Sequence, residues 1–200
     1  MICERILLWL ENQDRHTFES ERYGTPMVIP GSDRFVLRQF TLADARGYFE
    51  CHDDPDAKRN FMRTPNTLEE AEGIVQRIAE EYTNTTPHNE YFAIEIDGSF
   101  AGYVGIENLN EEHFAHRATI NFALHPSFRG QGIMTDAARL ITEYAFETYG
   151  LVRLQGFCRT FNTASARVLE KVGFELEGVL RKNKCRDGEF LDDMVWAIVR

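Results

Sequence analysis

The chain has 200 residues and a formal net charge of −10, with 32 acidic against 22 basic side chains. That length suits one domain with a sizeable core, and the acidic balance argues against a nucleic-acid partner, whose phosphate backbone attracts Lys and Arg. Hydrophobic residues make up 43% of the sequence without any run of about 18 apolar residues, so we expect no membrane partner.

The first 32 residues predict little regular structure. Gly and Pro interrupt them, as at Pro30 and Gly31, and the apolar run 6–10 is too short and too acidic at its flanks for a secretory signal. We therefore interpret residues 1–32 as an N-terminal extension and residues 33–200 as the domain.

The domain opens with one predicted strand and two predicted helices. Residues 34–40 alternate between apolar and polar side chains as a strand does, and Thr41 is placed as the N-cap of a helix over 43–52. Pro55 is expected to end that helix. A second helix is predicted over 67–82, with acidic residues in its first turn and an apolar face.

Three strand-like runs follow, at 91–97, 99–109 and 117–124. Asp97-Gly98 between the first two is a strong hairpin signal, and a polar loop joins the second to the third. These runs predict an antiparallel meander.

The last part of the chain alternates helices and strands. Helical periodicity follows the 117–124 strand and stops at Gly150, and a second helix begins at an Asn162 cap and ends at Gly173. Strands are predicted at 152–158, 174–181 and 189–199. The order βααβββαβαββ indicates an α/β fold that combines a mixed sheet with helices.

The loop before the first of these helices contains Gly130 and Gly132. Two glycines this close indicate a turn that needs their backbone freedom or a close approach to a ligand. A glycine loop that opens a helix presents free backbone N–H groups and the positive helix end to an anion. Arg129 adds a positive charge, so phosphate is the predicted ligand.

Two phosphate-binding signatures do not fit this loop. A P-loop needs Gly-Lys-Ser/Thr, whereas Gly132 is followed by Ile133 and Met134. The dinucleotide pattern GxGxxG has Thr135 at its third glycine, and the strand 152–158 does not end in an acid that would hold a ribose. A Rossmann dehydrogenase is therefore a distant alternative.

The loop resembles that of the GCN5-related N-acetyltransferase (GNAT) family, which reads Arg/Gln-x-x-Gly-x-Gly/Ala. Arg129 and Gly132 match, and Met134 replaces the final small residue. Residues 162–181 resemble the second signature of this family, and residues 187–199 its closing hairpin, both in the form of the branch that acetylates ribosomal-protein N-termini (RimJ/RimL-type). The resemblance covers roughly residues 33–200.

The resemblance implies a mixed, mostly antiparallel sheet that is splayed between the strands 117–124 and 152–158. Acetyl-CoA, as co-substrate, would lie in the resulting cleft. The residues implied to bind it are Phe122, Ala123 and Leu124 along pantetheine, Arg129, Gly130, Gln131, Gly132, Ile133 and Met134 around the pyrophosphate, and Asn162 and Ser165 near the thioester. Asn162 has a second interpretation, because Asn is a preferred N-cap without any ligand.

Catalytic groups are less clear than binding groups. The family often carries a Glu base where this chain has Thr119, and a Tyr acid where it has Leu169. Ser165 is the candidate hydrogen-bond donor to the reacting carbonyl, and Glu107 the candidate base, acting through water. Each residue also has an interpretation without a catalytic role: Ser165 would be a small residue packed on the helix face, and Glu107 an exposed side chain beside a loop.

The resemblance implies acetyl transfer to a primary amine by direct attack in a ternary complex; the alternative is a noncatalytic acetyl-CoA-binding module of the same fold. Acidic residues before the second helix and in a strand-joining loop would attract a cationic acceptor, namely a basic protein N-terminus, a polyamine or an aminoglycoside. They are Asp53, Asp54, Asp56, Glu111 and Glu112. Either a monomer or a homodimer is compatible with the sequence.

The cysteines and histidines predict no metal. Cys3, Cys51, Cys158 and Cys185 are far apart and form no CxxC pair, which is typical of reduced thiols in a cytoplasmic protein. His113 and His116 have a metal-like spacing, but no further ligand is near them in the sequence.

Overall fold

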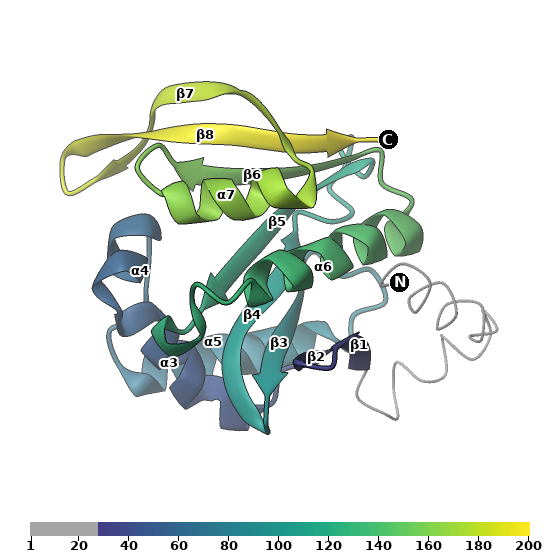
Figure 1. Cartoon of the computed structure of the whole chain (residues 1–200), viewed down its shortest axis with the longest axis vertical. Coiled ribbons are helices and arrows are strands. Elements are labelled where there is room, and N and C mark those ends of the chain that lie inside the picture. The colour runs from purple at the N-terminus through teal and green to yellow at the C-terminus, as the bar shows by residue number, and fades with distance from the viewer. Residues whose placement is uncertain (1–27) are drawn as a thin grey trace.

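A computed structural model describes residues 28–200 as one twisted sheet with helices on both of its faces (Figure 1). The eight strands of this part of the chain are ordered β1-β2-β3-β4-β5-β6-β8-β7. Neighbouring strands are antiparallel, except that β5 and β6 run parallel. The strands are β1 (Val28–Ser32), β2 (Phe35–Arg38), β3 (Glu90–Ile96), β4 (Ser99–Glu107), β5 (Arg117–Leu124), β6 (Arg153–Arg159), β7 (Glu175–Arg186) and β8 (Glu189–Val199).

The helices divide between the two faces of the sheet. They are α3 (Ala45–Asp53), α4 (Pro55–Asn60), α5 (Leu68–Glu81), α6 (Ile133–Tyr149) and α7 (Thr163–Val172), with short 3-10 turns at Leu42–Asp44 and Pro126–Phe128. Figure 1 shows α6 and α7 in front of the sheet and α3 and α5 behind it. The mixed α/β fold expected from the sequence is confirmed.

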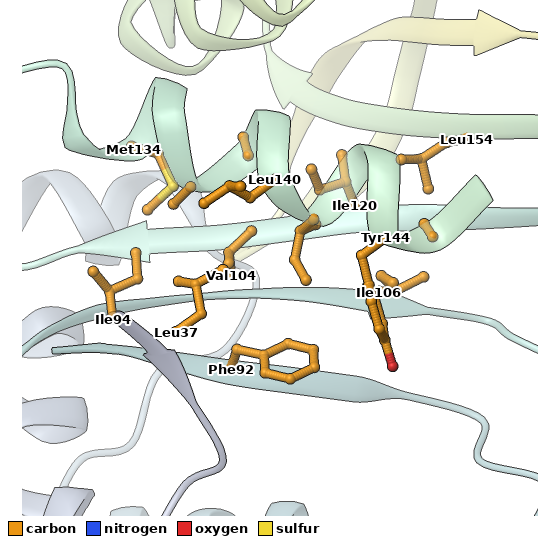
Figure 2. Close-up of a cluster of buried hydrophobic side chains, with 14 of the residues drawn as sticks. Leu37, Phe92, Ile94, Val104, Ile106, Ile120, Met134, Leu140, Tyr144 and Leu154 are labelled. Carbon is orange, nitrogen blue, oxygen red and sulfur yellow. The ribbon is translucent and has the colours of Figure 1, made fainter. Parts of the chain in front are cut away.

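Each face has its own core, because successive strand residues point to opposite sides. On one face, apolar strand residues meet the buried side of α6; Figure 2 shows Phe92, Val104 and Ile120 directed toward Leu140 and Tyr144. On the other face, α3 and α5 cover a more aromatic cluster that includes Phe40, Tyr48, Val75, Ala93 and Tyr103.

Two elements were missed from the sequence. Pro30 and Gly31 lie within β1, at the edge of the sheet, where proline is tolerated and the pairing with β2 has an irregularity. Residues 28–32 therefore belong to the sheet, and our boundary at residue 33 was too late; residues 1–27 of the extension lie outside the described residues. Pro55 does not simply end a helix, because it opens α4 at the first helical position, where proline fits well.

The parallel strands β5 and β6 separate partway along their length. Their pairing runs from Arg117↔Arg153 to Ile120↔Gly156 and stops there, although β5 continues to Leu124 and β6 to Arg159. Figure 1 shows the two strands diverging beyond this point. Residues 121–124 therefore have no neighbouring strand on the β6 side, which is the expected splay; we call this opening the fork.

Candidate active site

A cavity of about 720 Å³ occupies the fork. Residues from both faces of the sheet line it, because Glu107 and Cys51 belong to the α3 side while Ile133 and Met134 belong to the α6 side. Nearly every expected site residue lines this cavity: Glu107, Phe122, Ala123, Leu124, Arg129, Gly130, Gly132, Ile133, Met134, Asn162 and Ser165. Gln131 does not line the cavity. Its side-chain amide donates to Ser127 O at 3.3 Å, and its backbone carbonyl accepts from Arg34 at 2.8 Å.

The glycine loop opens α6 in the way that anion binding requires. Gly130 and Gly132 have φ of +76° and +80°, in the left-handed region that favours glycine. A Cβ at either position would meet nothing within 4 Å, so the glycines are needed for their backbone angles and not for space. Gly132 is the N-cap of α6, and the amides of Ile133, Met134 and Thr135 have no partner within the helix.

The positive charge of Arg129, which the sequence analysis assigned to phosphate binding, is paired within the protein. Its Nε donates to Leu124 O at 3.1 Å, and its Nη2 donates to Asp54 Oδ2 at 2.8 Å. Burial opposes ionisation of Asp54, but the hydrogen bonds from Arg129 and from the Ala57 amide hold the pKa of this carboxyl below its usual value. Arg129 therefore joins the end of β5 to the start of α4.

Asn162 and Ser165 form a pair at the start of α7. Asn162 Oδ1 accepts from the Ser165 amide at 3.1 Å, so the N-cap interpretation of Asn162 is correct. Asn162 Nδ2 also donates to Ser165 Oγ at 3.2 Å. Because a hydroxyl both accepts and donates, Ser165 keeps its hydrogen for a group in the cavity.

Glu107 is half-buried at the end of β4. Its Oε1 accepts hydrogen bonds from the Tyr91 hydroxyl and from Asn121 Nδ2, the latter at 2.8 Å. It is therefore held in place, unlike the freely exposed loop carboxylate of the interpretation without a catalytic role. Neither family position offers a substitute, since Thr119 is hydrogen-bonded to Asn108 and Gln155, and Leu169 is buried in the core.

Two cysteines that line the cavity and one histidine beside it are held neutral. Burial raises the pKa of the Cys51 thiol to about 12 and that of the Cys158 thiol to about 11, so neither is a thiolate near neutral pH. Burial lowers the pKa of His52, whose Nδ1 contacts Tyr48 O at 2.8 Å. Because all three side chains are buried and uncharged, we assign them a structural role.

Helix α4, which the sequence analysis missed, forms one lip of the cavity. The Arg59 guanidinium lies 4.2 Å from the centre of the Phe161 ring, in the loop before α7. At the same C-terminal end of the helix, Arg186 of β7 donates to Lys58 O at 2.6 Å and to Phe61 O at 3.1 Å. Pro55 directly after the capping Asp54 was the local signal that could have revealed this helix.

The charge of the cavity differs from that of the whole protein. Its lining includes more basic side chains (Arg59, Arg129, Arg159, Arg167, Lys171, Lys184) than acidic ones (Asp56, Glu107, Asp193). Of the acidic residues that we expected to attract a cation, Asp54 pairs with Arg129 and Asp53 pairs with Lys58. The cavity therefore suits an anion such as a polyphosphate better than a polycation.

His113 and His116 do not form a metal site. Both are exposed, and His113 lies 3.6 Å from Glu112. Within residues 28–200 no group of three or more His, Cys, Asp or Glu side chains is arranged to hold a metal ion. No helix in this part of the chain is both long enough and apolar enough to cross a membrane.

A model of the acetyltransferase (GNAT) domain matches residues 34–175. The chain belongs to the GNAT acetyltransferase family. It is 29% identical over 170 residues to the uncharacterized N-acetyltransferase YoaA of Bacillus subtilis, a match that spans 84% of this chain and 95% of YoaA. Spermidine N(1)-acetyltransferase of Escherichia coli is 30% identical over 99 residues, which is 50% of this chain and 52% of that protein.

The solved structures give the same family. Mycobacterium smegmatis RimJ in complex with CoA-disulfide superposes with a TM-score of 0.75 at 25% identity, covering 89% of this chain and 88% of RimJ. This GNAT protein is therefore an acetyl-CoA-dependent N-acetyltransferase, with acetyl-CoA as its co-substrate.

The residues of the cavity fit acetyl-CoA. The edge of β5 at residues 121–124 has no neighbouring strand on the β6 side, so its backbone groups there, apart from the Leu124 carbonyl that accepts from Arg129, can pair with an extended, amide-containing chain such as pantetheine. The free amides of the first turn of α6 and the surplus of basic side chains suit its phosphates.

Proposed function

We propose that this GNAT acetyltransferase transfers the acetyl group to the primary amine of a protein N-terminus, by direct attack in a ternary complex. The observation that carries this proposal is the single cavity through the fork, which brings the glycine loop and Glu107 together from opposite faces of the sheet. A donor held on the α6 side and an amine held on the α3 side would meet there without a covalent enzyme intermediate.

Each side chain has a defined task in this reaction. Acetyl-CoA supplies an activated thioester, and holding it beside an amine provides a large effective concentration. Glu107 takes the proton from the incoming ammonium, directly or through one water molecule, so that the amine becomes nucleophilic. Ser165 donates its hydroxyl hydrogen to the carbonyl oxygen as negative charge develops on that atom. Asn162 keeps Ser165 in position.

The charges in the cavity favour an acceptor with one amine over a polyamine. Asp56 lies 3.7 Å from Arg129, and Asp193 pairs with Arg159. Among the lining acids of the described residues, Glu107 alone has no cationic partner within ion-pair distance. One such carboxylate can receive one ammonium, whereas a polyamine carries several positive charges that would face Arg59 and Lys184.

A small cationic amine is the second candidate acceptor. Its support is the 30% identity to spermidine N(1)-acetyltransferase, which covers half of the present chain. A polyamine could enter if its remote ammonium groups stayed in solvent near the acidic surface of the protein. If a polyamine is the acceptor, activity should fall steeply with added salt, because salt screens the attraction between its ammonium groups and the exposed acidic side chains.

The test is thiol release from acetyl-CoA, measured with a chromogenic thiol reagent over a panel of N-terminal peptides, polyamines and aminoglycosides. Release that depends on a peptide N-terminus would support the proposal, and release with spermidine alone would support the second candidate. Calorimetry with acetyl-CoA accompanies the assay. Tight binding without release for any amine would favour the noncatalytic module, and no binding would contradict the assignment of the glycine loop.

A further inference from the structure

The two hydrogen bonds to Glu107 end on the same oxygen atom. Tyr91 from β3 and Asn121 from β5 both donate to Oε1, so the carboxylate is held from the strands on either side of β4. Among the described residues Oε2 has no hydrogen-bond partner. The carboxylate is thus fixed through one oxygen and keeps the other for a group in the cavity.

Gly105 makes this arrangement possible. Tyr91 and Asn121 are both register partners of Gly105, one on each side of β4, so the three residues form a row on the α3 face of the sheet. A Cβ at Gly105 would overlap the Tyr91 ring. Because the glycine has no side chain, the Tyr91 ring crosses β4 there and reaches Glu107, two residues further along the strand.

We propose that Tyr91 and Asn121 are positioning residues that orient the Glu107 carboxylate as the base of the acetyl transfer. The inference rests on the proposed function, because it assigns these residues a role in the proton transfer to Glu107. Neither residue is assigned a contact with the reacting atoms: each donates a hydrogen bond to Oε1 and so fixes the direction in which Oε2 points.

Three tyrosines interact electrostatically with Glu107: Tyr48 from α3, Tyr91 from β3 and Tyr103 from β4. Cys51 and His52 of α3 and Arg77 of α5 interact with these tyrosines. Burial raises the pKa of Tyr48 and of Cys51 to about 12 each, and raises the pKa of Tyr91 and Tyr103 further, so these groups stay protonated. Burial lowers the pKa of His52, which is therefore neutral near pH 7.

The experiment measures kcat against pH for wild type, Tyr91→Phe, Asn121→Ala and the double variant, with the best acceptor from the panel. Each single variant loses one donor to Oε1, so kcat at pH 7 should fall about tenfold while KM for acetyl-CoA stays within about twofold. The pH dependence of kcat should change in each single variant and change more in the double variant, because the group that takes the proton has lost one or both of the donors that orient it.

Tyr149→Phe is the matched control. The Tyr149 hydroxyl, at the end of α6, donates to Glu90 Oε2 of β3 at 2.5 Å; this is also a bond from a tyrosine to a strand glutamate, and neither residue lines the cavity. This variant should lose stability without moving the pH profile. If wild type releases thiol but Tyr91→Phe and Asn121→Ala keep the wild-type profile, the inference is overturned and the proposed function stands.

Failure of the proposed function would be seen separately, as no amine-dependent thiol release by wild type. Circular dichroism establishes the folding of every variant. If Tyr91→Phe does not fold, Asn121→Ala carries the test alone, because Asn121 lines the cavity and removing its amide leaves the sheet backbone intact. An unshifted profile in that variant would overturn the inference just as well.

Discussion

Arg129 and Asp54 form an ion pair at 2.8 Å although 75 positions separate them in the sequence. The pair connects the glycine loop before α6 with the N-cap of α4. It also neutralises the cation that the loop presents to a phosphate, so the loop relies on backbone amides and the helix end for much of its affinity for anions.

This pairing makes a prediction about acetyl-CoA affinity. In Asp54→Asn the amide can still cap α4, but the negative charge beside the loop is gone and Arg129 is released toward the phosphates. Acetyl-CoA should bind about threefold tighter or better by calorimetry at low salt. Asp53→Asn is the control, since Asp53 pairs with Lys58 at an exposed site; an equal gain in that variant would mean that only net charge matters.

The same variant predicts a pH dependence of stability. The pKa of Asp54 is lowered in the folded state, so its pairing contributes fully above the unfolded pKa of about 4 and is lost as the pH falls through the folded value. At pH 7 the free energy of unfolding of Asp54→Asn should be lower than that of wild type by about 0.5 to 1 kcal/mol, a small value because Arg129 is 38% exposed. Urea titrations should show that difference vanishing near pH 3; a difference that persists there would contradict the ionic origin of the effect.

Gly132 tests the loop through a pair of substitutions. Gly132→Glu and Gly132→Gln impose the same backbone strain at φ +80°, and neither side chain meets a neighbour near its Cβ. Only Glu places a negative charge at the anion site, so it should weaken acetyl-CoA binding more than tenfold relative to Gln. Calorimetry measures the difference in affinity, and equal affinities would contradict the assignment of this loop as the site that binds the phosphates.

Ser165→Ala tests the donor to the carbonyl oxygen. Asn162 still caps α7 through the amide of residue 165, so the helix should persist in the variant. We expect kcat to fall by roughly tenfold to a hundredfold, with acetyl-CoA affinity changed by less than about threefold. Steady-state kinetics and calorimetry together separate the two effects, and an unchanged kcat would leave Ser165 as a packing residue.

The sequence predicted the elements that depend on local signals. The alternation in 34–40, the helical period after Gly132 and the caps at Asn162 and Gly173 are all properties of neighbouring residues. β1 was missed because a strand containing Pro30 is defined by its pairing with β2, and the sequence around it looks like a turn.

The glycine loop was found from the sequence because it is one continuous motif, and all of its residues except Gln131 line the cavity. Their contact with acetyl-CoA stays a prediction. The partners of Arg129 and Glu107 were not predictable, because they follow from strand register and from the placement of α4. Gly105 shows this well: it reads as an ordinary strand glycine until its register partners Tyr91 and Asn121 are known.

The fork between β5 and β6 gives the sheet a property that an unbroken sheet does not have. In a continuous sheet the hydrogen-bonded backbone separates molecules bound on the two faces. Here the backbone is interrupted beyond Ile120 and Gly156, where β5 and β6 no longer pair. In the proposed reaction, a donor held on the α6 side and an acceptor held on the α3 side meet inside this opening without the sheet backbone between them.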